Sequence, residues 1–300
     1  MVSETVLTLI DKYRLMFINE KKVINSSDNT ISTYIYVLDM FYEYIVESEK
    51  LEVITDIDKE LILKFLTCNT THSNSTQILK LAVVKSFFIF IDEQEELEGF
   101  FEHRFKKINI KKEDKEVDAL SEEEVVKLIK IIKPKKSSFN SIRDSLLIKI
   151  ILYTGIRASE CLSIRLEDIS LIEENLYKIK IFGKGSKERY VYITADKIKD
   201  ELQELTEQEY INNYIAITNR GNRVTRIGLY NMISNKMKKA LINKSGVHIL
   251  RHTFARTLVN KNINLVTISE LLGHSDITIT AKTYAKSNEW NKIEAIRFLV

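Results

Sequence analysis

The sequence predicts a mainly α-helical protein of two domains that carries one small β-hairpin. Three observations lead to this fold class. The chain has 300 residues, which is enough to build two hydrophobic cores. It contains only 8 glycines and 1 proline, and this shortage of turn-forming residues disfavours a β-sandwich or a propeller. Apolar residues recur at helical spacing over most of its length.

The first domain, residues 1–102, is expected to be helical throughout. Apolar side chains within residues 32–48 fall at the spacing of one helix face. The acidic residues Asp56 and Asp58 predict an N-terminal cap for a helix over residues 59–66. A further amphipathic helix is expected over residues 75–90.

A basic segment, residues 103–118, is expected to link the two domains. Its cationic candidates for DNA binding are Arg104, Lys106, Lys107, Lys111 and Lys112. Such a charge run is either a solvated surface or a strap across a phosphate backbone, and both interpretations remain open. Residues 1–112 hold 14 Lys and Arg against 18 Asp and Glu, whereas residues 113–300 hold 31 against 24. The cationic C-terminal portion weakly indicates a polyanionic partner.

The second domain, residues 119–286, opens with a capping box. Ser121 is followed three residues later by Glu124, a pattern typical of a helix start. Apolar residues alternate with lysines over residues 177–181 before Gly183, which predicts a strand and a turn. The expected elements are helices over 121–132 and 140–153, a β-hairpin within 175–193, and helices from about residue 195 onward with a loop over 212–223.

Several classes of protein and site are excluded by patterns that the sequence lacks. Two cysteines, Cys68 and Cys161, exclude a disulfide framework and a cysteine-based zinc site, and indicate a reducing cytoplasm. No run of eighteen apolar residues exists, and no basic segment follows Met1, so we expect neither a membrane span nor a signal peptide. Metal-binding and Walker patterns are also missing, so no cofactor, metal or ATP is expected.

The few glycines lie beside cationic side chains. Gly155 precedes Arg157 by two residues, two glycines flank Lys184, and Gly273 directly precedes His274. Each glycine alone is a plausible helix cap. Together they predict turns that hold Arg, Lys and His side chains at the ends of elements, as in many phosphate sites.

A third cationic cluster is expected on one helix. His248, Arg251 and His252 are spaced so that they share one helix face. A buried arginine needs a negative partner, which is either a carboxylate of the chain or a bound anion. Cys161 lies in an apolar helical setting and is expected in the core. Tyr284 is the only tyrosine after Tyr230, and as a lone helical tyrosine it could serve packing or catalysis.

Five short segments, taken in order, resemble the tyrosine recombinases, the family of the phage integrases and the chromosome-dimer resolving recombinases. They are Thr154–Glu160, Gly183–Arg189, His248–Ala255, Leu271–Ser275 and Thr283–Ala285. The resemblance implies that residues 1–102 form a core-binding domain that clamps DNA and that residues 119–286 form the catalytic domain. It also implies that residues 287–300 form a tail helix that docks on a neighbouring protomer, and a helix folded back on its own domain remains the alternative.

The resemblance assigns catalytic roles to six residues: Arg157, Lys184, His248, Arg251, His274 and Tyr284. The two arginines would clamp the scissile phosphate, and His274 would hydrogen-bond to it. Tyr284 would attack phosphorus and form a 3′-phosphotyrosyl bond, without metal or ATP.

Proton transfer and support are assigned in the same way. Lys184 would protonate the leaving 5′-oxygen, and His248 would assist proton transfer at the nucleophile. Glu160 and His252 would act as supporting residues, Glu160 by orienting an arginine or a histidine. Additional contacts to DNA would come from Lys187 and Arg189. The family usually places the tyrosine nine residues after the residue at His274, and the spacing here is ten.

The implied partner is double-stranded DNA with paired recombination sites, bound by a homo-tetramer, with a possible accessory protein or partner recombinase. Two alternatives remain: a non-catalytic DNA-binding regulator of the same fold, and a type IB-like topoisomerase or telomere resolvase. The implied location is the cytoplasm, on the nucleoid, and the Lys-, Ile- and Asn-rich composition is typical of a low-GC bacterium or its mobile elements.

Overall fold

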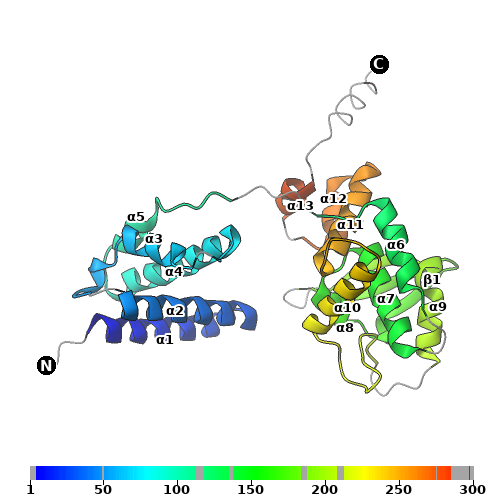
Figure 1. Ribbon diagram of the computed structural model, residues 1–300, viewed down its shortest axis with the longest axis horizontal. Coiled ribbons are helices and arrows are strands. Elements are labelled where there is room, and N and C mark those ends of the chain that lie inside the picture. The colour runs from blue at the N-terminus through cyan, green and yellow to red at the C-terminus, as the bar shows by residue number, and fades with distance from the viewer. Residues whose placement is uncertain are drawn as a thin grey trace. The chain divides into compact units, whose positions relative to one another are not determined.

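The computed structural model describes residues 5–48, 51–69, 71–112, 118–134, 138–183, 188–207, 213–274, 276–284 and 297. The chain divides into two compact units, Met1–Lys115 and Glu116–Val300 (Figure 1). Both are mainly helical, and the second contains a small antiparallel sheet. The fold class predicted from the sequence is therefore confirmed.

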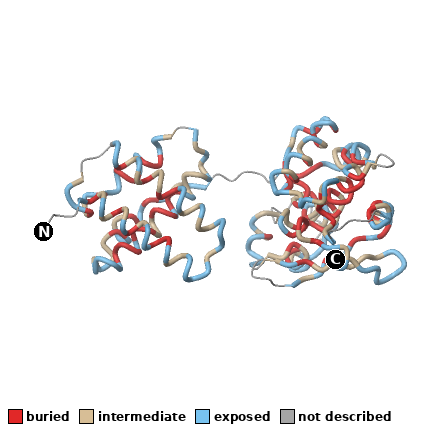
Figure 2. The backbone as a smooth tube through the Cα atoms, turned by 90° about the horizontal axis from the view of Figure 1, so that it is seen from below, coloured by how far each residue is buried: buried red, intermediate tan, exposed pale blue. Residues whose placement is uncertain are grey.

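The first unit is a helical bundle around an aromatic core. Its elements are α1 (Val6–Val23), α2 (Asp28–Ser48), the 3-10 turn η1 (Ile54–Asp56), α3 (Lys59–Thr67), α4 (Asn74–Gln94) and α5 (Phe100–Phe105). Asp58 caps α3 as predicted, because its Oδ1 accepts a hydrogen bond from the backbone N–H of Leu61 at 2.8 Å. The rings of Phe41, Phe65 and Phe88 pack edge to face in the centre, where the buried residues of this unit gather (Figure 2).

Helix α4 is the most apolar helix of this unit. Among the described residues it is the one helix whose length and composition would suffice to cross a membrane. Its buried residues include Leu81, Val84, Phe88 and Ile91, and they contact the core from more than one face of the helix. A helix that is apolar on several sides is typical of the centre of a helical bundle, which accounts for this composition.

The first unit extends further along the chain than predicted. Residues 103–105 belong to α5, and the side chains of Phe105 and Ile108 are buried in the first core. The Lys85 ammonium donates a hydrogen bond to the carbonyl of Ile108 at 2.8 Å. The predicted linker over 103–118 therefore begins too early. Its residues 113–117 lie outside the described residues.

The second unit packs helices against one face of its small sheet. Its elements are α6 (Glu122–Ile132), α7 (Phe139–Thr154), α8 (Ala158–Ser163), the 3-10 turn η2 (Leu166–Asp168), β1 (Ile169–Glu173), β2 (Leu176–Phe182), β3 (Glu188–Thr194), α9 (Ala195–Thr206), α10 (Arg226–Lys239), α11 (Val247–Asn260), α12 (Leu265–Leu272) and α13 (Ile277–Tyr284). The predicted capping box is present, since Ser121 and Glu124 each accept a hydrogen bond from the other's backbone N–H.

The predicted hairpin is β2 and β3, and β1 adds a third, unpredicted strand in the order β1-β2-β3. Ile179 pairs with Val191 and both are buried, whereas Lys178 pairs with the exposed Tyr192. This alternation places the isoleucines and valine toward the helices and the lysines toward solvent. The sheet thereby fixes the position of Gly183, which directly follows β2.

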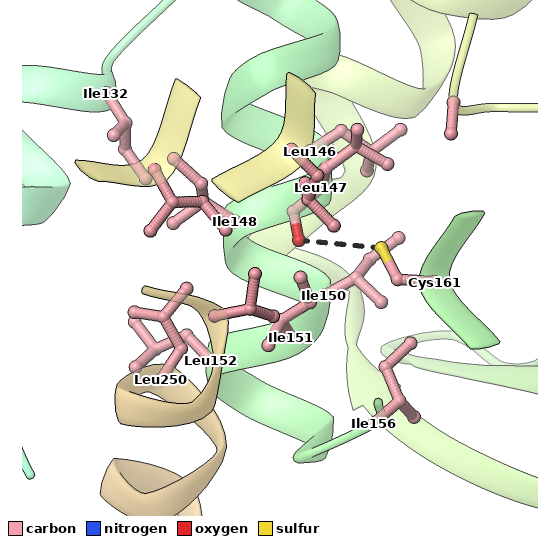
Figure 3. Packing of buried hydrophobic residues seen from close by; sticks show 14 of the residues in the cluster. Ile132, Leu146, Leu147, Ile148, Ile150, Ile151, Leu152, Ile156, Cys161 and Leu250 are labelled. Carbon is pink, nitrogen blue, oxygen red and sulfur yellow. Dashed lines mark hydrogen bonds between the residues drawn. The ribbon is translucent and has the colours of Figure 1, made fainter. Parts of the chain in front are cut away.

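Helix α7 is the centre of the second core (Figure 3). It contributes Leu146, Leu147 and Ile150, all fully buried, and the Cys161 thiol lies 4.0 Å from the carbonyl of Leu147. Burial strongly raises the pKa of Cys161, so this thiol is a packing group as predicted. Beside this core, Tyr284 packs against a smaller cluster of buried residues on α11 and α12: Ala255, Ile268 and Leu272.

Candidate active site

Two glycine turns bring the predicted catalytic segments together. Gly155 ends α7 and Gly273 ends α12, both with left-handed backbone angles (φ +66° and +64°). A Cβ atom on Gly155 would lie 2.4 Å from the ring of Phe254, and one on Gly273 would lie 2.7 Å from Nε of Arg189. Both positions therefore need glycine for its backbone angle and for close packing.

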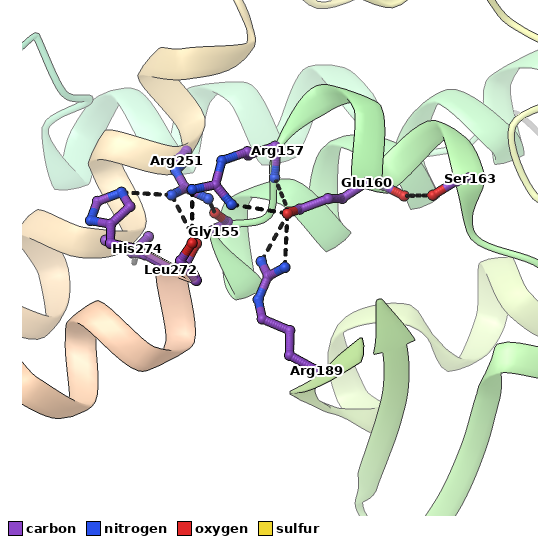
Figure 4. Close-up of polar contacts among 9 residues, drawn as sticks. Gly155, Arg157, Glu160, Ser163, Arg189, Arg251, Leu272 and His274 are labelled. Atoms are coloured by element: carbon purple, nitrogen blue, oxygen red, sulfur yellow. Dashed lines mark hydrogen bonds and ion pairs between the residues drawn. The ribbon is translucent and has the colours of Figure 1, made fainter. Parts of the chain in front are cut away.

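Each of the two glycine carbonyls accepts a hydrogen bond from one of the predicted phosphate-binding arginines. Arg251 Nη1 donates to the carbonyl of Gly155 at 2.6 Å, and Arg157 Nη2 donates to the carbonyl of Gly273 at 2.9 Å. Arg251 is almost fully buried, whereas the Arg157 side chain is 39% exposed. Figure 4 shows their guanidinium groups side by side. The hydrogen bonds described occupy three of the five N–H donors of Arg251 and two of those of Arg157.

Glu160 is the buried carboxylate that holds this cluster. It accepts hydrogen bonds from the backbone N–H of Arg157 at 2.7 Å and from Nη1 of Arg157 at 3.0 Å. It also accepts both Nη groups of Arg189, at 2.8 and 2.9 Å (Figure 4). Burial alone would raise the pKa of Glu160, but these hydrogen bonds outweigh it and hold the pKa below its usual value.

The cluster is strongly cationic. Arg157, Arg189 and Arg251 face the single carboxylate of Glu160, so two positive charges remain unbalanced within it. Burial and the nearby charge of Arg157 lower the pKa of Arg251 to about 10. Such an excess of fixed, partly buried positive charge fits an anion such as a phosphodiester.

The hydrogen bonds of His274 define its protonation state. Its Nε2 lies 2.8 Å from Nη2 of Arg251, and its Nδ1 lies 2.7 Å from Oγ1 of the buried Thr280. Because a guanidinium can only donate, Nε2 must be the acceptor and Nδ1 carries the proton. Burial and the charges of Arg251 and Arg157 lower the pKa of His274 to about 4, so the ring is neutral at neutral pH.

Tyr284 ends α13 beside the second histidine of α11. Its Oη lies 2.5 Å from Nδ1 of His252, and the two ring centroids are 5.9 Å apart. Burial raises the pKa of Tyr284 to about 12, and Arg251 counteracts this only in part. His248, which the resemblance assigns to proton transfer at the nucleophile, is exposed, and no hydrogen bond to Tyr284 is described for it.

The candidate DNA-binding residues fall into three groups. Arg189, predicted as a contact to DNA, is mostly buried and bound to Glu160, so the structure places it inside the arginine cluster. Arg104 is half-buried; its Nη1 donates to the carbonyls of Thr55 and Ile57, and its guanidinium lies over the Phe100 ring. The predicted lysines that are described are exposed: Lys106, Lys107, Lys111 and Lys112.

The remaining predictions lie outside the described residues. They concern the general acid Lys184, the DNA contact Lys187, and most of the tail helix over 287–300. Sequence reasoning missed two features of the site. Thr280 carries no motif that distinguishes it, and the partnership of Arg189 with Glu160 joins residues that lie 29 positions apart.

In this helical domain, two arginines donate hydrogen bonds to the carbonyls of glycine turns, and a histidine contacts the hydroxyl of a tyrosine. This arrangement matches the class of tyrosine recombinases. Comparison with known proteins gives the same class. Residues 118–290 match the phage integrase family. The tyrosine recombinase XerH of Campylobacter jejuni is 35% identical over 279 residues, covering 88% of this chain and 77% of that one. XerC of Staphylococcus epidermidis is 29% identical over 287 residues, covering 93% and 94%.

Solved structures show the same architecture. A XerH recombinase bound to palindromic difH DNA in a post-cleavage complex superposes with a TM-score of 0.77 at 28% identity, over 92% of this chain and 81% of that one. A λ integrase dimer bound to a core site has a TM-score of 0.68 at 15% identity, over 90% and 96%, and supports the fold alone. The chain belongs to the phage integrase family. It is a tyrosine recombinase similar to the Xer proteins, and so an enzyme of site-specific recombination, as the sequence predicted.

Proposed function

We propose that this recombinase cuts and rejoins double-stranded DNA at paired sites, with Tyr284 as the nucleophile. Tyr284 Oη attacks the scissile phosphorus, the Oη–P bond forms, and the bond from phosphorus to the 5′-oxygen breaks. The 3′-phosphotyrosyl bond conserves the energy of the broken phosphodiester. Rejoining therefore needs no ATP, and the arginines supply the charge for which other enzymes use a metal.

The observation that carries this proposal is the position of Tyr284 next to the arginine cluster. The Tyr284 hydroxyl contacts His252, which directly follows Arg251 on α11. Arg251 and Arg157 lie side by side, with N–H donors that no described hydrogen bond uses (Figure 4). A phosphate held by these donors would gain most when negative charge grows on its oxygens in the transition state. His274, linked to Arg251, would contribute a further contact to the phosphate.

Lys184 and the first unit complete the proposal. In the sequence, Lys184 comes two residues after Phe182, the last residue of β2, and it would protonate the 5′-oxygen as it leaves. The first unit would clamp the duplex, with Lys106, Lys107, Lys111 and Lys112 on phosphates of its backbone. Four copies would act on two DNA sites in the bacterial cytoplasm. Each copy would dock its residues 287–300 on a neighbouring copy. The proposed reaction is compatible with accessory proteins and with an origin in a mobile element.

The proposal is tested by trapping the covalent intermediate. The probe is a pool of nicked duplexes with randomised arms, from which the wild-type chain selects and covalently retains its own site. We expect an adduct with wild type in EDTA, none with Tyr284→Phe, and unchanged yield with Tyr192→Phe, which alters an exposed tyrosine on β3. An adduct that persists in Tyr284→Phe, or wild-type protein that binds but never forms one, would contradict the proposal.

A further inference from the structure

The contact between His252 and Tyr284 joins two elements of the second unit at the nucleophile. His252 lies on α11, one residue after Arg251, and Tyr284 is the last residue of α13. Their Nδ1 and Oη atoms are 2.5 Å apart, a short hydrogen bond between half-buried side chains. The atom of Tyr284 that must lose its proton therefore already has one nitrogen base in contact.

The direction of this hydrogen bond follows from the charge state of both rings. Burial, the neighbouring His248 and the charge of Arg251 lower the pKa of His252 to about 4, while burial raises that of Tyr284 to about 12. At neutral pH the histidine is thus neutral and the tyrosine is protonated. Oη donates to Nδ1, and the His252 proton resides on Nε2.

Between His274 and Tyr284, helix α13 carries two contacts to histidines. Thr280 and Tyr284 are four residues apart and therefore lie on the same face of the helix. Thr280 binds Nδ1 of His274, and Tyr284 binds Nδ1 of His252. One face of one short helix thus holds both histidines, and with this spacing the tyrosine meets His252 in its own subunit.

From this geometry we infer that His252 accepts the proton of Tyr284 during cleavage, the role that the resemblance gives to His248. The inference rests on the proposed function of Tyr284. As the Oη–P bond forms, the Oη–H bond breaks and its proton moves to Nδ1 of His252. The electron pair of the breaking P–O bond stays on the 5′-oxygen, which takes a separate proton from the general acid. Religation returns the proton from Nδ1 to Oη.

The surroundings of His252 keep the tyrosine inactive until DNA binds. The titratable and charged groups that act on His252 are His248 and Arg251 on α11, Tyr284 on α13, and His274 in the turn before α13. Without DNA, the positive charge of Arg251 opposes a second positive charge on His252. A phosphate bound by Arg157 and Arg251 offsets that charge, so the ring becomes a stronger base when the substrate arrives.

The test measures the rate of adduct formation on the duplex that wild type selects from the randomised pool. We expect His252→Asn, which keeps a polar group near the Nδ1 position but cannot take up a proton, to slow cleavage ~100-fold or more. The defect should persist on the same duplex with a 5′-bridging sulfur, because a thiolate leaves without an acid. On that substrate, the rate of adduct formation by Lys184→Ala should return to the wild-type rate. The control His103→Asn, an exposed histidine of α5, should cleave at the wild-type rate.

The pH profile on the bridging-sulfur duplex separates base catalysis from mere positioning. For wild type the rate should rise with pH as the histidine loses its proton and then level off, and His252→Asn should lose this rise. Nitrogen-15 spectra of the five histidines in the DNA-free chain should show an unprotonated, hydrogen-bonded Nδ1 on His252 that changes in Tyr284→Phe. A His252→Asn rate within ~3-fold of wild type would overturn the inference while leaving the proposed function intact. Failure of wild type to form any adduct would overturn both.

Discussion

The two units of the chain stabilise themselves in different ways. The first buries phenylalanines against one another and keeps most of its charges at the surface, with Lys80 and Asp92 among the few exceptions. The second surrounds an aliphatic core and buries two arginines and two carboxylates: Arg143, Arg251, Glu160 and Glu201. Buried charge is costly unless every partner is present. The second unit thus carries more of this cost, and part of it falls on Arg251 and Glu160, where we propose that an anion binds.

The largest effect should come from the aromatic core of the first unit. Phe88 is fully buried and packs against the rings of Phe41, Phe101 and Phe105, so Phe88→Ala leaves a large cavity. We expect a loss of about 3–5 kcal/mol in the free energy of unfolding of this unit. Hydrogen exchange of α4 and α11 in the full chain checks whether the loss is confined to the first unit. An equal loss of protection in α11 would contradict the comparison.

A somewhat smaller effect should come from the charge cluster of the second unit. Glu160→Gln leaves Arg157 and Arg189 facing a neutral amide in a buried position. We expect a loss of about 3 kcal/mol in the free energy of unfolding, together with weaker adduct formation. Chemical denaturation, followed by a signal from α11, measures the loss in the free energy of unfolding. The matched control is Asp196→Asn, which alters an exposed pair with Lys197 and should cost less than about 0.5 kcal/mol.

Apart from the substitutions, the stability of the second unit should also depend on pH. The folded-state pKa values of His252 and His274 are both about 4, below the value of about 6.5 for an unfolded histidine. As the pH falls from about 6.5 to about 4, the unfolded chain takes up protons that the folded chain does not, so the free energy of unfolding decreases. Unfolding of α11 across this range measures the slope, which should diminish in His252→Asn. A pH slope in His252→Asn equal to that of wild type would contradict the low pKa assigned to His252.

Local signals in the sequence predicted much of the fold, and contacts between distant residues limited the rest. The capping box of Ser121 and Glu124 and the hairpin of β2 and β3 are written in neighbouring residues, and both were confirmed. Strand β1 was missed because it is short and largely exposed, so it lacks a clear alternation of apolar residues. The segment over 103–108 was read by its charge, although Phe105 and Ile108 decide its place in the core.

In the candidate site, too, contacts between residues distant in the sequence limited the prediction. The glycine turns at Gly155 and Gly273 were found because scarce glycines lay next to cationic residues. The sequence could not show that Arg189 turns inward to Glu160, because an exposed and a buried arginine on a strand look alike without the fold. Nor could spacing alone decide which histidine meets Tyr284, since His248 and His252 share a helix face.

The short helix α13 has one consequence for how such an enzyme can be silenced. Thr280 and Tyr284 lie one turn apart on the same ridge of α13, so the proposed nucleophile and the support of His274 belong to one rigid helix. A shift of that ridge away from α11 would withdraw the attacking oxygen and release the imidazole in the same movement. With the roles proposed for Tyr284 and His274, a subunit would then lose its attacking oxygen and the support of its phosphate-binding histidine together.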